Sequence, residues 1–525
     1  MSLAVGMSRV TGLVREMVMA HFFGAGFAND AFRVGFLIPN LTRDLFAEGA
    51  LSSAFIPAFV DSMHNKGRKE AAHLANLVAT ALIIVVGALC IFGMIFAPEM
   101  VNWLAGTFHE TPGKFEQAVT MTRVMWPFLL LVAMAAQVMG ILNSCGQFGV
   151  PATASTLFNI FSLAAGLSIG FIGPFGISPI EGMAWGVVIG GGMQLAWQIP
   201  SLHKQGFHFR PAFDWSHPGM RRILKQMGPA ILGNSAVQIN VTVNTHLATH
   251  IMDPIRGYNG PVSWLQYAFR FMQFPLGLFG VAIASATLTS ISRSAASGNM
   301  DEFRRTLSRS LGMVFLLTIP SSVGLVLLGE SMIGAVYQGG KIVPYDTQQI
   351  AVALCYYALG LSGYSALKVL TPAFYALKDS RTPMMVSMCS VLINYGVAVS
   401  MIRGAGLGHA GLALATSVVA NFGFLVLFLL LRKRIGGIHG RALFETVIKV
   451  AFASMLMGVA VYGSTHLMRH LVGTTKIARI ADLLVSIPIG VAIFYNACRY
   501  AKIAEMEMAL KAVTAPVARL RAKIR

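Results

Sequence analysis

Eight basic residues lie inside the long apolar segments of this 525-residue sequence, where charged side chains are rare. They are Arg9, Arg15, Arg33, Arg43, Arg123, Arg270, Lys368 and Lys449. One arginine at the centre of a bilayer costs about 3 kcal/mol on insertion scales, so eight such groups facing lipid would cost on the order of 24 kcal/mol. We therefore expect them to face one another, acidic groups or water. Guanidinium groups bind phosphate oxygens through paired hydrogen bonds, so they predict recognition of a phosphate-bearing anion.

The first two apolar segments also contain four acidic residues. Glu16, Asp30, Asp44 and Glu48 are numerous enough to offset the four arginines of these segments one for one. Arg123, Arg270 and Lys368 have no acid in their own segments, which leaves the interior with excess positive charge around an expected wet cavity. Asp30 is expected near the outer end as a cap of the second segment, with Arg33 snorkelling or pairing locally with it.

Motifs of catalysis and metal binding are weak or missing. The sequence contains no G-x-S-x-G, H-E-x-x-H or P-loop pattern. His246 and His250 are four residues apart but have no acid or thiol nearby, and the five cysteines are scattered. We expect no enzyme activity, no metal and no cofactor. One alternative stays open: a monovalent cation bound by Asn234, Asn240, Asn244, Asn394 and Thr416, although hydrogen bonding between helices is the favoured role of these residues.

The composition places these residues in a membrane protein. Hydrophobic residues make up 55% of the chain and charged residues 12%, against about 25% in soluble domains. The mean hydropathy is +0.66. These values exclude a soluble domain, a disulfide scaffold and a disordered chain. The net charge of +19 does not indicate nucleic acid, because most basic residues lie between the apolar runs.

The hydropathy pattern predicts an all-α polytopic protein with about fourteen transmembrane helices. The inner loops and the tail hold 25 Lys and Arg residues and the outer loops seven, if both termini are cytoplasmic. This orientation is therefore predicted. The expected spans are 1–23, 30–60, 74–105, 119–144, 151–172, 182–202, 222–251, 262–292, 307–329, 347–375, 382–402, 409–431, 443–466 and 481–500.

A weak internal repeat divides the predicted spans into two groups of six. Ala31-Phe32-Arg33 precedes Pro39 in one half, and Ala268-Phe269-Arg270 precedes Pro275 in the other. An even number of spans gives both halves the same orientation, as in transporters with parallel lobes related by an axis along the membrane normal. Chance similarity between apolar segments is the alternative. The predicted domains are an N-lobe at 1–204, a C-lobe at 205–435, two further helices at 436–501 and a basic amphipathic tail at 502–525, which is expected on the anionic inner leaflet.

The first sixty residues resemble a known family. The segments are Ser8-Arg9-Val10-Thr11-Gly12-Leu13-Val14-Arg15-Glu16, Phe23-Gly24-Ala25-Gly26, Asp30-Ala31-Phe32, Pro39-Asn40-Leu41, Phe46-Ala47-Glu48-Gly49-Ala50 and Ala54-Phe55-Ile56-Pro57. They resemble the MurJ (MviN) family of lipid II flippases, within the multidrug/oligosaccharidyl-lipid/polysaccharide exporter superfamily. Further similarity covers nearly the whole chain and includes Gln226-Met227-Gly228-Pro229-Ala230, Arg270 with Phe274-Pro275, Ala295-Ala296-Ser297-Gly298 and Lys368-Val369-Leu370.

The resemblance implies export of lipid II, the undecaprenyl-pyrophosphate-linked peptidoglycan precursor, across the bacterial inner membrane by alternating access. It implies headgroup binding by four cavity arginines: Arg9, Arg15, Arg43 and Arg270. It implies further polar cavity sites at Ser8, Glu16, Asp30, Glu48, Ser263 and Lys368. The helices at 436–501 would form a groove for the lipid tail. The expected state is a monomer, with the cell-wall synthesis machinery as a protein partner.

Two departures from the family pattern bear on the site. Glu16 stands where an aspartate is usual, and Gln273 replaces an acid that often follows the cavity arginine by three residues. The alternatives from the sequence are an exporter of another polyprenyl-pyrophosphate-linked oligosaccharide and a multidrug exporter of the same superfamily. The excess positive charge argues against cationic drugs as substrates.

Overall fold

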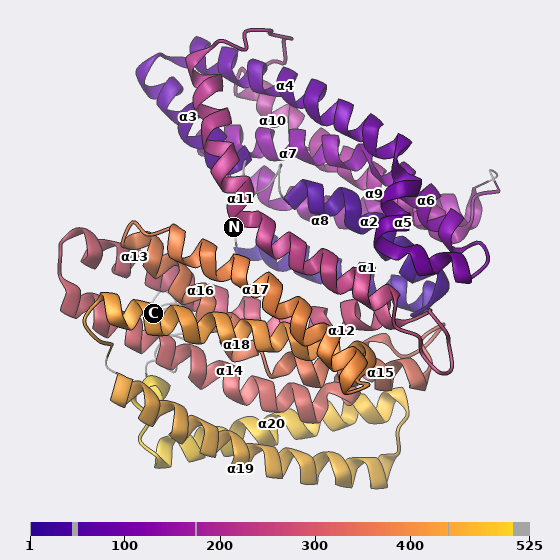
Figure 1. The fold of residues 1–525 in the computed structure, drawn as a ribbon, viewed down its shortest axis with the longest axis vertical. Helices are drawn as coiled ribbons and strands as arrows, with labels where there is room; N and C mark the ends of the chain where they lie inside the picture. The colour runs from indigo at the N-terminus through magenta and orange to yellow at the C-terminus, as the bar shows by residue number, and fades with distance from the viewer. Residues whose placement is uncertain (1, 45–50, 174–175, 439, 508–525) are drawn as a thin grey trace, which may run out of the picture. The chain divides into compact units, whose positions relative to one another are not determined.

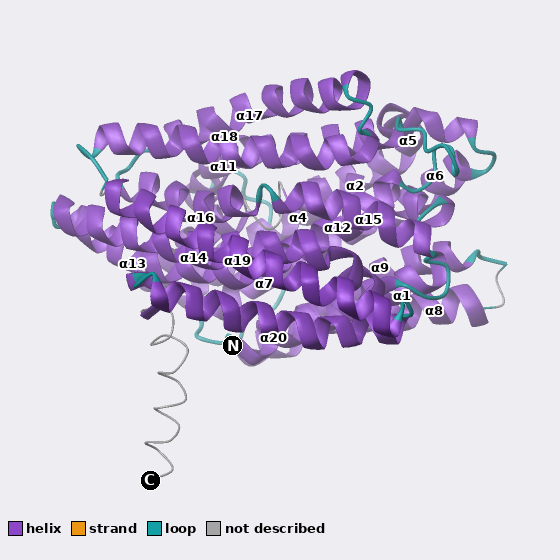
Figure 2. Cartoon of the chain, turned by 90° about the horizontal axis from the view of Figure 1, so that it is seen from below, coloured by secondary structure: helices purple, strands orange, loops and turns teal. Residues whose placement is uncertain are grey.

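The computed structural model describes residues 2–44, 51–173, 176–438 and 440–507. All regular elements within these ranges are helices, joined by short loops (Figure 2). Extended pairing there is limited to two isolated bridges, Asp253 with Gly257 and Gly339 with Ile342. The predicted all-α class is therefore confirmed. The chain forms two compact units, unit 1 at Met1–Ser263 and unit 2 at Trp264–Arg525.

Unit 1 contains the helices drawn from indigo to magenta in Figure 1. Most are α-helices of nine residues or more, and two short non-α turns, η2 and η3, interrupt the series. The helices are α1 (Ser2–Phe23), α2 (Phe27–Arg43), α3 (Ser52–Asn65), α4 (Arg68–Ile95), α5 (Ala97–Ala105), η2 (Gly106–Glu110), α6 (Lys114–Met125), α7 (Pro127–Ser144), α8 (Gly149–Leu167), η3 (Ser168–Ile172), α9 (Pro179–Ala196), α10 (Ile199–Lys204) and α11 (Pro218–Thr249).

Unit 2 is built around one long helix, α14 (Met300–Tyr337), which packs against α13, α15, α16, α19 and α20. Helix α12 starts in the last residues of unit 1 and continues into unit 2. The remaining elements are α12 (Pro261–Pro275), η4 (Leu276–Val281), α13 (Ala282–Ala296), α15 (Pro344–Ala358), α16 (Leu361–Ala376), α17 (Arg381–Val399), η5 (Ser400–Gly404), α18 (Gly408–Arg434), α19 (Gly440–Val472) and α20 (Lys476–Tyr500).

Each of the fourteen predicted spans overlaps a helix or a continuous series of helices. Nine helical segments of the described chain are long and apolar enough to cross a membrane, or ten if α15 and α16, which meet at 45°, form one broken span. The count of fourteen spans is not confirmed. The helices that fall short include α1, which contains Arg9, Arg15 and Glu16, and α2, which has 17 residues.

Small residues allow the closest helix packing in unit 1, between α8 and α9. Gly182, Gly186 and Gly190 follow one another at intervals of four on α9, so they share one face. A Cβ atom on Gly186 would lie 2.2 Å from the backbone oxygen of Ser162, and one on Gly182 would lie 2.5 Å from the Cα of Gly170. In a membrane the hydrophobic effect no longer drives helices together, so close van der Waals contact between backbones contributes to their association.

The boundary between the compact units differs from the predicted lobe boundary at 204/205. Helix α11, the first helix predicted for the C-lobe, packs against α3, α4 and α5 and so belongs to unit 1. Helices α19 and α20 pack against α14 inside unit 2. The predicted lobes were defined by the repeat, which these contacts do not test, and they stay a prediction. Of the predicted tail at 502–525, residues 508–525 lie outside the described residues.

Candidate functional site: charged clusters on the first helices

One acidic side chain on α1 faces two arginines. Glu16 Oε2 lies 3.2 Å from Arg33 Nη2 on α2, and Glu16 Oε1 lies 3.8 Å from Arg15 Nη2. The exposed fractions of the three side chains are 13%, 9% and 18%. One carboxylate therefore contacts two guanidinium groups, and Arg15 keeps part of its surface accessible. An accessible guanidinium is suited to binding an anion.

Helix α8 supports this part of α1. The Arg15 guanidinium lies 5.3 Å from the ring centroid of Phe158, which is cation–π range. Asn159 Nδ2 donates to the backbone oxygen of Ser8 at 3.2 Å, and a Cβ atom on Gly12 would lie 3.5 Å from the same nitrogen. Ser8, Gly12 and Arg15 are spaced at i, i+4 and i+7, so they share one face of α1, and that face packs at least in part on α8.

A second cluster lies at the end of α2. Arg43 donates to Asp44 Oδ1 through Nη2 at 2.7 Å and through Nε at 3.0 Å. Gln238 on α11 donates to the other carboxylate oxygen of Asp44 at 3.3 Å. The Arg43 side chain remains 23% exposed. Glu48, which the family resemblance implied as a polar cavity site, lies outside the described residues.

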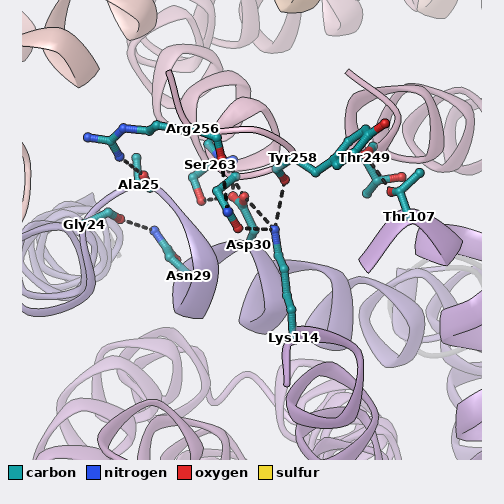
Figure 3. Close-up of polar contacts among 12 residues, drawn as sticks. Gly24, Ala25, Asn29, Asp30, Thr107, Lys114, Thr249, Arg256, Tyr258 and Ser263 are labelled. Atoms are coloured by element: carbon teal, nitrogen blue, oxygen red, sulfur yellow. Dashed lines mark hydrogen bonds and ion pairs between the residues drawn. The ribbon is translucent and has the colours of Figure 1, made fainter. Parts of the chain in front are cut away.

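Asp30 in the first turn of α2 has a fully buried carboxylate with four partners (Figure 3). Oδ2 accepts from the backbone nitrogen of Gly260 at 2.7 Å. Oδ1 accepts from the backbone nitrogen of Ser263 at 3.0 Å and from its hydroxyl at 2.5 Å. Gly260 directly precedes α12 and Ser263 is its third residue, so Asp30 caps α12 from a different helix. The fourth partner is Lys114.

Lys114, the first residue of α6, is also fully buried. Its Nζ atom lies 3.4 Å from Asp30 Oδ2, 3.0 Å from the carbonyl oxygen of Tyr258 and 2.8 Å from Asn259 Oδ1. The ring of Phe108 covers the ammonium at 4.0 Å from the ring centroid. An ammonium has three N–H donors, and three oxygens surround this one. Figure 3 shows Lys114 reaching from α6 toward Asp30 and the loop before α12.

Two of the predicted pairings are corrected by this geometry. Arg33 pairs with Glu16 and not with Asp30, because its side chain points toward α1. Asp30 caps α12 instead of its own helix. The four acids therefore do not offset the four arginines one for one: Glu16 serves two arginines, and Asp30 faces a lysine. Sequence reasoning missed Lys114, which it counted among the basic residues of the outer loops.

The predicted site residues of unit 2, and Arg9 of unit 1, have more open surroundings. Arg270 is exposed on α12, with Nη1 at 3.5 Å from Gln273 Oε1. Lys368 on α16 is exposed, and so is Arg9 on α1. Each unit thus presents accessible cationic side chains. The two histidines that were considered as metal ligands bond to backbone oxygens: His246 to Leu104 at 3.1 Å, and His250 to His246 at 2.8 Å.

The comparisons with known proteins agree with one another. A family model described as lipid II flippase MurJ matches residues 19–481. A lipid II flippase MurJ of Burkholderia cenocepacia is 35% identical over 436 residues, which are 82% of each chain. A probable lipid II flippase MurJ of Buchnera aphidicola is 32% identical over 467 residues, which are 89% of each chain.

Comparison with solved structures also finds a lipid II flippase MurJ. The fold is similar to a lipid II flippase MurJ in an inward closed conformation, with a TM-score of 0.77, 25% identity and coverage of 95% of this chain and 98% of that one. An inward-facing multidrug resistance MATE transporter of the MOP superfamily superposes with a TM-score of 0.65 at 14% identity, over 81% of this chain and 98% of the transporter. At that identity the similarity concerns the fold alone.

Proposed function

This chain belongs to the MurJ family of lipid II flippases, and from that premise we propose how its charged residues move lipid II across the membrane. The protein is a lipid II flippase, a multi-pass membrane transporter of peptidoglycan biosynthesis and not an enzyme. Alternating access agrees with its fold, which it shares with MOP-superfamily transporters. The proposal concerns the residues that bind the headgroup, the path of the lipid tail and the orientation of the chain.

Four arginines, Arg9, Arg15, Arg43 and Arg270, bind the pyrophosphate and sugar headgroup in this proposal. The observation that carries it is the Arg15–Glu16–Arg33 cluster, where one carboxylate serves two guanidinium groups and Arg15 keeps part of its surface accessible. Guanidinium groups match the oxygens of a pyrophosphate in two-point hydrogen bonds.

The other polar sites divide into two groups. Ser8, Glu16, Glu48 and Lys368 are proposed to line the path of the headgroup. Asp30 and Ser263 are fully buried and bonded to each other, which supports a role in positioning α12, the helix that contains Arg270. Binding of a monovalent cation in the second half, which would couple ion movement to transport, is a separate proposal. Its candidate ligands Asn394 and Thr416 are buried in α17 and α18.

The lipid and protein surroundings complete the proposal. Helices α19 and α20 carry exposed apolar side chains, among them Leu471, Ile477 and Leu484, which support a groove for the polyprenyl tail. The protein would lie in the bacterial inner membrane as a monomer, with both termini in the cytoplasm and the basic tail 502–525 on anionic lipid. Contact with the cell-wall synthesis machinery is proposed because that machinery uses lipid II at the outer surface.

The test in cells is depletion of the protein followed by measurement of lipid II accessibility from outside. We expect outward-facing lipid II to fall while total lipid II rises, and wild-type protein to restore both. An Arg222→Ala protein is the matched control, because Arg222 forms an exposed ion pair with Asp61 away from the clusters described above. Normal lipid II export after depletion, in a strain with no second flippase, would contradict the proposal.

A further inference from the structure

The loop between α11 and α12, residues 250–260, is fastened to the beginning of α2 and to the segment from α5 to α6 (Figure 3). Arg256 Nη1 donates to the backbone oxygen of Ala25 at 2.6 Å. Just before the loop, Thr107 Oγ1 donates to the backbone oxygen of Thr249, the last residue of α11, at 2.7 Å. Asp253 folds the loop internally by accepting from the backbone nitrogens of Ile255 and Arg256, both at 2.9 Å. The loop is therefore a preformed turn held at several points.

The Asp30–Lys114 pair is the buried centre of this attachment. Asp30 makes its three short hydrogen bonds, of 2.5 to 3.0 Å, to Gly260 and Ser263. Lys114 makes its two short bonds, of 2.8 and 3.0 Å, to Asn259 and Tyr258. The two ions are 3.4 Å from each other, which is longer than the 2.7–2.9 Å usual for a hydrogen bond between opposite charges. Each ion is thus bonded more closely to the loop than to its counterion.

This arrangement gives both ions an alternative partner if the loop detaches. All the short bonds of the pair end on residues 258–263, so detachment would break them together. A buried charge without a partner is strongly unfavourable, but Asp30 and Lys114 already lie close enough to form a direct ion pair after a small movement. The exchange of partners would offset part of the cost of detachment. Alternating access requires contacts between helices that form in one conformation and break in the other.

We propose that Lys114 is a positioning residue of the flippase, which holds Asp30 in place to cap the first turn of α12. When that turn is released, the Lys114 ammonium leaves the oxygens of the loop and pairs directly with Asp30. Lys114 is fully buried and contacts no headgroup in this role. It acts through Asp30, Tyr258 and Asn259. The transport part of this inference rests on the proposed function, whereas the attachment of the loop can be measured without any substrate.

The first measurement is hydrogen–deuterium exchange of the purified full-length protein in lipid nanodiscs. Lys114→Met removes the charge and both loop contacts, so the amides of Gly260 and Ser263 should exchange about tenfold faster than in the wild type. Lys69→Met, at an exposed lysine of α4, is the matched control and should leave these amides unchanged. Equal exchange in the Lys114→Met and wild-type proteins would overturn the inference.

A milder variant covers the case in which Lys114→Met does not fold. Asn259→Ala removes one acceptor of the ammonium at a residue that is not fully buried. We expect a smaller increase in exchange at the same two amides. If Asn259→Ala leaves both amides as in the wild type while the Lys114→Met protein cannot be purified, the inference is wrong.

The second measurement distinguishes a positioning role of Lys114 from two others: binding of lipid II, and a simple ion pair with Asp30. In translocation assays, Lys114→Met should lower the maximal rate about tenfold and leave the half-saturating lipid II concentration unchanged. The double variant Asp30→Lys, Lys114→Asp should restore neither rate nor exchange protection, because a lysine at position 30 has no acceptor for the amides of Gly260 and Ser263. A raised half-saturation value, or rescue by the double variant, would refute the positioning role.

The outcome also distinguishes this inference from the proposed function. Arg15→Ala should abolish translocation and leave the exchange of Gly260 and Ser263 unchanged. A chain that shows the expected exchange pattern but never moves lipid II would contradict the proposed function alone.

Discussion

The Asp30–Lys114 pair and the Arg15–Glu16–Arg33 cluster each include a residue of α2, but they differ in burial and in the partners of each charge. The first has one cation for one anion, full burial and a hydrogen-bond partner for each donor of the ammonium. In the second, one carboxylate contacts two guanidinium groups, and the side chains remain partly exposed. The same residue types therefore build a fully buried attachment in one place and, in the other, the partly accessible cluster that is proposed to bind the headgroup.

The difference has a physical cause in burial. Removing one partner of a buried ion pair leaves a charge that neither water nor protein stabilises, at a cost of about 3–5 kcal/mol. A partly exposed arginine can still be solvated, so losing a partner there costs less than in a buried pair. Variants of the buried pair should thus affect stability first, whereas variants of Arg15, the more exposed arginine of the Glu16 cluster, should affect transport first.

The largest effect is expected from Asp30→Asn. The amide keeps one acceptor oxygen for α12 but leaves the Lys114 ammonium without its counterion, so the free energy of unfolding should fall by about 3–5 kcal/mol. Thermal unfolding in detergent, followed by intrinsic fluorescence, measures this loss. The matched control is Asp61→Asn, in an exposed pair with Arg222, which should cost less than ~1 kcal/mol. Similar losses in both variants would show that burial does not set the difference.

Arg15→Ala should have the opposite profile. The loss of one charged contact to the headgroup, about 3 kcal/mol, corresponds to roughly a hundredfold slower translocation, which abolishes complementation of a depleted strain. Expression and thermal stability should stay close to the wild type. The same loss of function is predicted for Arg270→Ala in unit 2. Full complementation by both variants would remove the basis for headgroup binding.

Arg33→Ala tests whether the two arginines that face Glu16 are equivalent. Arg33 is the more buried and lies closer to the carboxylate, so its removal should cost about 1–3 kcal/mol of stability. Translocation should slow less than about tenfold, because Arg15 retains both Glu16 and its accessible surface. Arg123→Ala, at an exposed guanidinium that bonds to the carbonyl of Met94, is a suitable control. A transport loss as large as that of Arg15→Ala would make Arg33 a headgroup residue.

The smallest effect is expected from Glu16→Asp, which introduces the residue that is usual in the family. The aspartate side chain is shorter by one methylene group, but its carboxylate would still face Arg33, so translocation should change less than about threefold. Initial rates in vesicles can resolve such a change. A strong loss would show that the longer side chain is required for the geometry of this cluster.

Helical periodicity and apolar length predicted the fold class because both are local properties of the chain. Every predicted span overlaps helix within the described residues, and the charged residues on the first two helices were identified as a group. The partners of those charges were predicted poorly. Asp30 bonds to residues 230 positions and more away in the sequence, and Lys114 meets Asn259 across 145 positions. No local pattern encodes such contacts. Lys114 follows a glycine at the start of a helix, where a lysine ordinarily indicates only an exposed loop.

Reconstitution of the purified protein in vesicles that contain labelled lipid II in one leaflet tests the central claim most directly. The account predicts that the wild-type protein makes the label accessible from the opposite side, and that Arg15→Ala protein, inserted in equal amount and equally stable, does so about as slowly as protein-free vesicles. Equal translocation by wild-type and Arg15→Ala proteins would contradict the claim that arginine side chains of this site bind the pyrophosphate of lipid II.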